Sequence, residues 1–174
     1  MASELRYADG SYAIDFADLE EKLARETTSL FIFCNPHNPI GKVWDRPTLE
    51  RIAELCIKHD VLVVSDEIHC DLTHIGHAYI PFASLSKEIA DRTISCIAPT
   101  KTFNIAGLQT AAIVIPNPEI RKQVDRGINT DEVAEPNTFA IQAAEAAFDE
   151  GEEWLEELRE YLELNREFLI GSLK

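Results

Sequence analysis

Continuous apolar runs alternate with amphipathic segments along most of this chain. The apolar runs predict buried strands at 29–34, 61–64, 93–98 and 110–115. Apolar positions spaced three or four residues apart predict helices that follow Asp15, that run from Asp45 to about 59, and that cover 82–90 and 118–126. Strands without polar alternation, separated by helices, are typical of a mainly parallel sheet with helices on both faces, so we expect an α/β fold in three α/β/α layers.

The last third of the chain predicts helices only. A loop at 127–135 leads to a helix at about 137–148 and then to a long amphipathic helix that starts at Glu152. The apolar stripe of this last helix is interpreted as a packing face and consists of Trp154, Leu155, Leu158, Leu162 and Phe168. The strands and the chemistry they position are therefore expected before residue 119.

Composition narrows the class of protein. The 174 residues include 16 Lys and Arg against 31 Asp and Glu, a formal charge of −15, and 45% are hydrophobic. This composition is that of a globular domain, and the acidity argues against nucleic acids and anionic membranes as partners. No apolar run reaches the ~20 residues of a membrane span, and the first six residues lack the apolar stretch of a secretory signal.

The four cysteines lie at 34, 56, 70 and 96, without the paired spacing of zinc sites. We interpret them as free thiols in a reducing compartment, which favours a cytoplasmic location.

Three polar residues follow the three predicted parallel strands. Asn38, Asp66 and Lys101 come after the strands at 29–34, 61–64 and 93–98. Each alone is commonly a turn residue, a helix cap or a solvated charge. Ligands of open α/β sheets bind beyond the carboxyl ends of the strands, so together an amide, a carboxylate and an amine at one edge indicate a binding site.

The motifs around these residues resemble those of fold-type I enzymes dependent on pyridoxal 5′-phosphate (PLP), the class I and II aminotransferases and their relatives. The motifs are Asn35-Pro36-His37-Asn38-Pro39-Ile40-Gly41, Ser65-Asp66-Glu67-Ile68-His69 and Thr100-Lys101-Thr102-Phe103-Asn104-Ile105-Ala106-Gly107-Leu108. Their details, together with Pro81-Phe82-Ala83-Ser84-Leu85, are most similar to the cystathionine β-lyase (C–S lyase) branch, the MalY/PatB group.

The resemblance assigns a role to each matching residue. Lys101 would form the Schiff base with PLP, Asp66 would pair with the pyridine nitrogen, and Asn38 would bond the 3-oxygen next to His69, with a cis Asn38–Pro39 bond. Thr100 would contact the phosphate. Two positions depart from the pattern of many relatives, which have a phosphate-binding Ser at Ala98 and a phosphate-binding Arg at Gln109.

The resemblance also implies a longer protein, because neither the Gly-rich phosphate loop nor the aromatic ring that stacks on PLP occurs before Ser29. We therefore expect residues 1–150 to be part of a large PLP-binding domain, and 151–174 to lead toward a small domain that carries the substrate-binding Arg. The expected whole protein is a homodimeric lyase that cleaves a small sulfur amino acid to pyruvate, ammonia and a thiol, with this fragment inactive alone.

Three alternatives remain at this point. An aminotransferase would use every residue named above, because the two reactions share one intermediate: the lyase reaction expels a β-thiolate from it, whereas transamination reprotonates it at the cofactor carbon. A phosphotransfer domain of the receiver or haloacid-dehalogenase type would use Asp66, Thr100 and Lys101, but Ile68 stands where the second needs an aspartate, and the Asn38-Pro39 motif would have no role. The third alternative is a truncated domain without catalytic activity.

Overall fold

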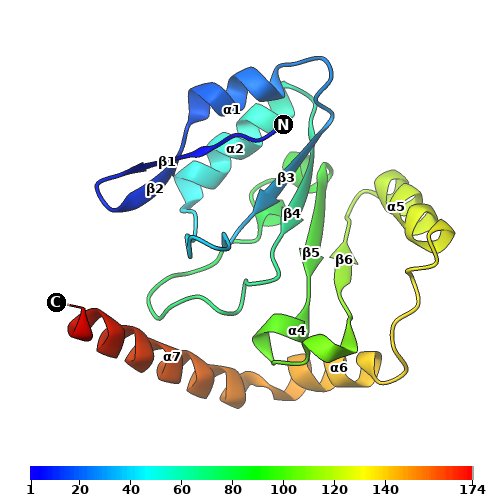
Figure 1. The fold of residues 1–174 in the computed structure, drawn as a ribbon. Helices are drawn as coiled ribbons and strands as arrows, with labels where there is room; N and C mark the ends of the chain where they lie inside the picture. The colour runs from blue at the N-terminus through cyan, green and yellow to red at the C-terminus, as the bar shows by residue number, and fades with distance from the viewer. Residues whose placement is uncertain (174) are drawn as a thin grey trace.

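A four-stranded sheet lies at the centre of the computed structural model, which describes residues 1–173 (Figure 1). The strand order is β3-β4-β5-β6. The first three strands are parallel to one another and comprise β3 (Leu30–Cys34), β4 (Leu62–Asp66) and β5 (Thr93–Ile97). β6 (Ala112–Val114) pairs antiparallel with β5. The predicted mainly parallel sheet is confirmed, and the strand expected at 110–115 is a shorter edge strand.

One face of the sheet is covered by α1 (Phe16–Leu23) and α2 (Arg46–Lys58). The predicted apolar positions Leu49, Ile52 and Cys56 of α2 are fully buried, in one cluster with Phe33 and Val63 of the sheet. α2 begins where expected, because the Asp45 side chain accepts a hydrogen bond from the Thr48 amide at 3.0 Å. The sequence pattern of α2 thus determines which side of the sheet becomes the core.

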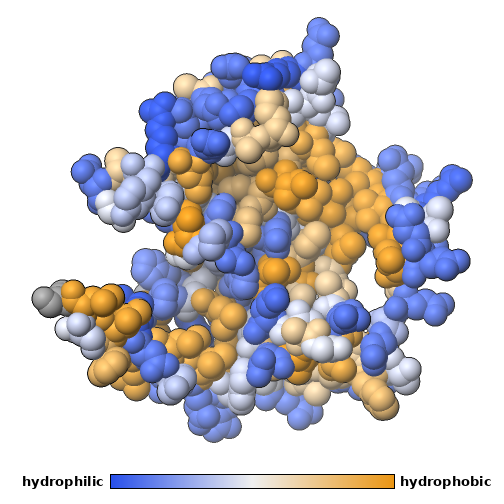
Figure 2. All heavy atoms as spheres, in the orientation of Figure 1, coloured by the Kyte–Doolittle hydropathy of each residue, from blue (hydrophilic) through white to orange (hydrophobic). Residues whose placement is uncertain are grey.

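The opposite face is not covered by helices within residues 1–173. Leu30 and Ile32 of β3 are 46% and 71% exposed, and Ile113 of β6 is 42% exposed. Figure 2 shows apolar atoms gathered over this part of the molecule. The mixed α/β class is confirmed, whereas the expected helical cover of both faces is found on one face only. Successive side chains of a strand point to opposite faces, so these apolar strands bury alternate residues under the helices and leave the others accessible on the uncovered face.

The predicted helix at 82–90 is two short helices instead. A 3-10 helix, η1 (Phe82–Ser84), is followed by α3 (Lys87–Ala90). Ser86 separates them, because its backbone is extended and its hydroxyl accepts a hydrogen bond from the Ile89 amide at 3.2 Å. A local cap therefore interrupts the apolar periodicity.

An N-terminal hairpin was not predicted. β1 (Leu5–Ala8) and β2 (Ser11–Ile14) pair antiparallel across Asp9 and Gly10. Both turn residues have positive φ, 51° and 77°, the conformation that an Asp-Gly pair favours in a two-residue hairpin.

The chain after β5 is mainly helical. A single turn, α4 (Pro99–Thr102), and the 3-10 helix η2 (Ala106–Leu108) precede β6, and three helices follow: α5 (Pro118–Thr130), α6 (Ala140–Glu150) and α7 (Glu152–Ser172). α5 continues beyond its predicted end and includes Gly127, so the loop expected at 127–135 begins only after Thr130.

The predicted long helix is confirmed as α7, but none of its stripe residues is buried within residues 1–173. Phe168, at the C-terminal end of the stripe, is 78% exposed. In the described part of the chain, no helix has both the length and the apolar character that crossing a membrane requires.

Candidate active site

The ends of the three parallel strands lie at one edge of the sheet, as predicted. Cys34, Asp66 and Cys96 are register partners on β3, β4 and β5. The Asn35 amide donates to the Asp66 carbonyl at 3.0 Å, and the Glu67 amide donates to the Cys96 carbonyl at 2.9 Å. The loops that carry the candidate residues therefore start side by side.

Asp66 is the last residue of β4 and is half-buried. The Ile68 amide donates to its Oδ1 at 3.3 Å, and no other hydrogen bond from the described residues reaches the carboxylate. Its register partners Cys34 and Cys96 share its face of the sheet. Burial raises the pKa of both thiols, and the Asp66 charge raises it further, so each stays neutral. The carboxylate therefore keeps a free oxygen for a ligand.

The loop after β3 is held by backbone and side-chain hydrogen bonds. The buried Asn35 side chain accepts from the Trp44 amide at 3.1 Å, and the His37 amide donates to the Lys42 carbonyl at 2.7 Å. The Asn38–Pro39 bond is cis, which confirms the prediction, and the Asn35–Pro36 bond is cis as well. Asn38 itself is exposed, so the fixed loop leaves its amide available for binding.

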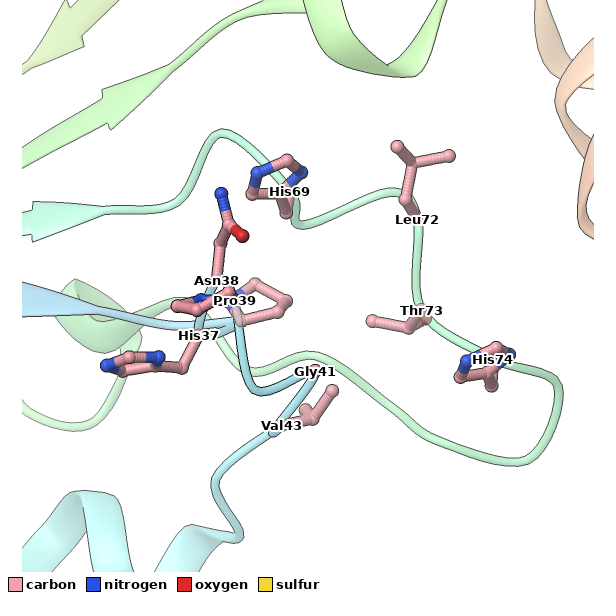
Figure 3. A pocket seen from close by; sticks show the side chains of 10 residues that line it. His37, Asn38, Pro39, Gly41, Val43, His69, Leu72, Thr73 and His74 are labelled. Carbon is pink, nitrogen blue, oxygen red and sulfur yellow. The ribbon is translucent and has the colours of Figure 1, made fainter. Parts of the chain in front are cut away.

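Asn38 and His69 line the same cavity of about 210 Å³ (Figure 3). In Figure 3 the Asn38 amide extends toward the half-buried His69 ring, which comes from the loop after β4. The structure thus brings these two candidates together. Asp66, Thr100 and Lys101 do not line this cavity.

Lys101 and Thr100 lie on α4, directly after β5. Pro99 occupies the first turn, and Ala98, the N-cap residue, offers no side-chain hydrogen bond. Thr100 is half-buried and Lys101 is exposed. Within residues 1–173 the Lys101 amine makes neither a hydrogen bond nor an ion pair, so it is available to react with a ligand carbonyl.

The loop at 67–81, after β4, forms the wall of the cavity opposite the loop after β3, and sequence reasoning missed its supports. Thr73 and His74 line the cavity, and both contact α7: Arg159 Nε donates to the Thr73 carbonyl at 3.1 Å, and His74 Nδ1 lies 3.1 Å from Glu163 Oε2. Figure 1 shows this loop reaching toward α7. No periodic pattern marks such contacts in the sequence.

Glu67 also supports this loop, a role that the sequence analysis did not predict. It is 2% exposed, and its Oε1 accepts from Ser65 Oγ at 2.8 Å and from the Phe82 amide at 3.0 Å. Burial, followed by the hydrogen bond to Glu67, raises the pKa of Tyr79. The carboxylate next to Asp66 thus anchors the far end of the loop at 67–81. The sequence signal that could have predicted this role is a glutamate that comes directly after a buried strand.

The chain is similar to C–S lyases over almost all of its length. Cystathionine β-lyase PatB of Bacillus subtilis is 52% identical over 157 residues, which cover 90% of this chain and 41% of PatB. The structure of cystalysin from Treponema denticola, which contains PLP, superposes with a TM-score of 0.94 at 35% identity, covering 96% of this chain and 42% of that one. The PLP-bound C–S lyase of Staphylococcus hominis gives a TM-score of 0.87 at 38% identity, covering 98% and 42%.

The chain thus spans about two fifths of the length of these relatives. The family model for aminotransferase class I and II matches residues 3–174. The resemblance expected from the three strand-end motifs is confirmed over nearly the whole chain, and the chain belongs to the class I and II aminotransferase family.

Proposed function

We propose that residues 1–174 are part of the cofactor-binding domain of a PLP-dependent C–S β-lyase that converts a sulfur amino acid to pyruvate, ammonia and a thiol. The observation that carries the proposal is the convergence of the Asn38 loop, Asp66 and the α4 turn with Lys101 at one sheet edge. The 52% identity to PatB supports the lyase reaction.

The side chains at this edge fit the polar groups of PLP. The Asn38 amide suits the 3-oxygen, with His69 beside it, and the free oxygen of Asp66 suits a protonated pyridine nitrogen. The Lys101 amine suits the aldehyde carbon, and Thr100 provides a hydroxyl for the phosphate. When bound, PLP supplies an electron sink for the pair of electrons left at the substrate α-carbon.

The residues of the chain then have distinct tasks. Lys101 first holds the cofactor through its amine and then accepts the α-proton of the substrate at Nζ. Asp66 keeps the ring nitrogen protonated through its carboxylate, which increases the electron demand of the ring. Asn38 orients the ring by donating to its oxygen. The three tasks require an amine, a carboxylate and an amide, and these are the groups found at this edge of the sheet.

Cofactor attachment can be tested on the longest natural polypeptide that contains residues 1–174. With PLP we expect a visible absorbance band that borohydride converts to a permanent adduct on Lys101, located by peptide mass spectrometry. Lys101→Ala should abolish the adduct, and Lys87→Ala, at an exposed lysine of α3, should retain it. An adduct that persists in Lys101→Ala would contradict the assignment.

An aminotransferase is the second candidate, because the matching family model is that of class I and II aminotransferases. Incubation with cystathionine alone separates the two reactions. A lyase accumulates pyruvate over many turnovers, whereas an aminotransferase stops after one turnover until a keto acid is added. Stoichiometric product without a keto acid would reject the lyase proposal.

The remaining expectations concern the whole protein. We propose a cytoplasmic homodimer in which residues 1–150 belong to the large domain and α7 leads toward a small domain. The four free cysteines are consistent with a reducing compartment. Sedimentation of the natural polypeptide tests the dimer.

A further inference from the structure

The turn that carries Lys101 cannot hold its own position. α4 has four residues, and its N-cap residue Ala98 provides no side-chain hydrogen bond. A helix of one turn is unstable without tertiary contacts, because a single turn fixes several backbone angles for very few hydrogen bonds. The orientation of α4 is therefore set by what its side chains contact.

One buried side chain of α4 makes such a contact. Thr102 is fully buried, and its Oγ1 donates to Asp71 Oδ2 at 3.0 Å. Within residues 1–173 this is the one side-chain hydrogen bond made by α4. It joins the turn that carries Lys101 to the loop that begins after Asp66, although the two partners are 31 positions apart in the sequence.

The loop on the other side of this bond is itself well fixed. The Cys70 amide donates to the Glu67 carbonyl at 2.9 Å, and the Leu72 amide donates to the His69 carbonyl at 3.0 Å, so Asp71 lies inside the second of two overlapping turns. Burial, and then the Asp71 carboxylate, raises the pKa of Cys70 to about 12, so the adjacent thiol stays neutral. No cation among residues 1–173 forms an ion pair with Asp71, which leaves its carboxylate to accept a charge-assisted hydrogen bond from Thr102.

We propose that Asp71 is a positioning residue: through Thr102 it fixes α4, and so sets where the Lys101 amine lies relative to Asp66. This inference rests on the proposed role of Lys101. The hydrogen bond to Thr102 is the contact through which Asp71 reaches α4. Misplacing a reacting group by about 1 Å can lower a rate by about 100-fold, which makes such a bond important for catalysis.

The first measurement needs no cofactor. In the apo form of the natural polypeptide, we expect Asp71→Ala and Thr102→Val to speed hydrogen exchange of the Phe103 and Ile105 amides, which bond to Pro99 and Thr100 of α4. The amides of β4 should be unaffected. Thr102→Ser, which keeps the hydroxyl, should exchange like the parent. Exchange at Phe103 and Ile105 that is unchanged in Thr102→Val would overturn the inference.

The second measurement separates positioning from simple stability. With PLP and cystathionine, we expect Asp71→Ala and Thr102→Val to lower kcat by about 10- to 100-fold with KM changed less than about threefold, and Thr102→Ser to restore most of kcat. Asp131→Asn, at an exposed aspartate at the end of α5, is the matched control and should leave both constants unchanged. If Asp71→Ala fails to fold, the Thr102→Val and Thr102→Ser pair decides.

The two proposals fail in different ways. If Lys101→Ala keeps the borohydride adduct, the proposed function is wrong. If Lys101→Ala loses the adduct while Thr102→Val reacts like the parent, only the role of Asp71 is wrong. A Thr102→Ser variant as slow as Thr102→Val would also reject it, because the hydroxyl would then not be the group that matters.

Discussion

Gly151 lies directly against the ring of Phe103, the residue that follows the α4 turn. A Cβ atom at 151 would come within 2.4 Å of Phe103 Cε1 and 2.3 Å of the Ala147 carbonyl oxygen. Phe103 also packs against Trp154 and Phe148, with ring centroids 5.7 and 6.2 Å away. The junction of α6 and α7 is thus in contact with the segment that carries Lys101.

We therefore predict that Gly151→Ala destabilises the chain by about 1–3 kcal/mol, because the added methyl group must displace an aromatic ring and a backbone carbonyl. Urea unfolding followed by circular dichroism measures the change. Gly127→Ala is the matched control within α5, where a Cβ would meet no atom within 4 Å. There, the higher helix propensity of alanine should add up to about 1 kcal/mol. Equal effects at the two sites would contradict the contact.

Glu67→Ala should lower the free energy of unfolding by about 1–3 kcal/mol, because it leaves the Phe82 amide and the Ser65 hydroxyl without their buried acceptor. Denaturant unfolding checks this. Glu54→Ala, at an exposed position of α2, should change stability by no more than about 0.5 kcal/mol. A Glu67→Ala variant as stable as Glu54→Ala would show that water replaces the lost acceptor.

The cap of α2 predicts a dependence of stability on pH. Hydrogen bonds from Thr48 hold the pKa of Asp45 below its usual value, so the carboxylate stabilises the fold above pH ~4, and this contribution is lost as the pH falls through the lowered pKa. Asp45→Ala should cost about 1 kcal/mol at pH 7 and progressively less below pH ~4. Parallel unfolding curves for parent and variant at both pH values test this. A loss that is constant with pH would contradict the charged cap.

The thiols predict a labelling pattern. Burial raises the pKa of Cys56 to about 12, and burial followed by the Asp71 charge raises that of Cys70 to about 12. Between pH 8 and pH 10, labelling of Cys70 by iodoacetamide should accelerate about 100-fold, because the thiolate fraction grows tenfold per pH unit below the pKa. A free thiol of pKa ~8.5 would gain only about fourfold.

Mass spectrometry of the labelled peptides gives these rates, and the urea-unfolded chain is the control. Cys56, which is fully buried, should label even more slowly than the half-buried Cys70. Fast labelling of Cys70 at pH 8 would mean that its thiol is not held in this environment.

Sequence reasoning worked where a repeating pattern carried the information. Continuous apolar runs located β3, β4 and β5, and so the edge at which Asn38, Asp66 and Lys101 follow them. The Asp45 cap and the spacing of Leu49, Ile52 and Cys56 located α2 and its buried side. Both signals arise from residues that are close together in the chain, which is why a single sequence was enough to predict these elements.

What the sequence did not reveal depends on pairs that lie far apart. Asp71 and Thr102 meet only because β4 and β5 are adjacent, and nothing periodic relates them. The hairpin strands have four residues each, too short for alternation to stand out, and Gly127 stays helical although glycine usually suggests an end. The interruption of 82–90 depends on the cap at Ser86, which the apolar spacing concealed.

The two walls of the cavity belong to different parts of the molecule. Pro36 to Gly41 form the wall that continues from β3, whereas Thr73 and His74 form the wall that hydrogen bonds attach to α7. The wall formed by Thr73 and His74 is consequently shared between the sheet, which holds Glu67, and α7, which holds the loop at its tip. A shift of α7 would therefore have to be absorbed by the residues around Thr73 and His74, while the parts of the loop at Glu67 and Asp71 stay with the sheet and α4.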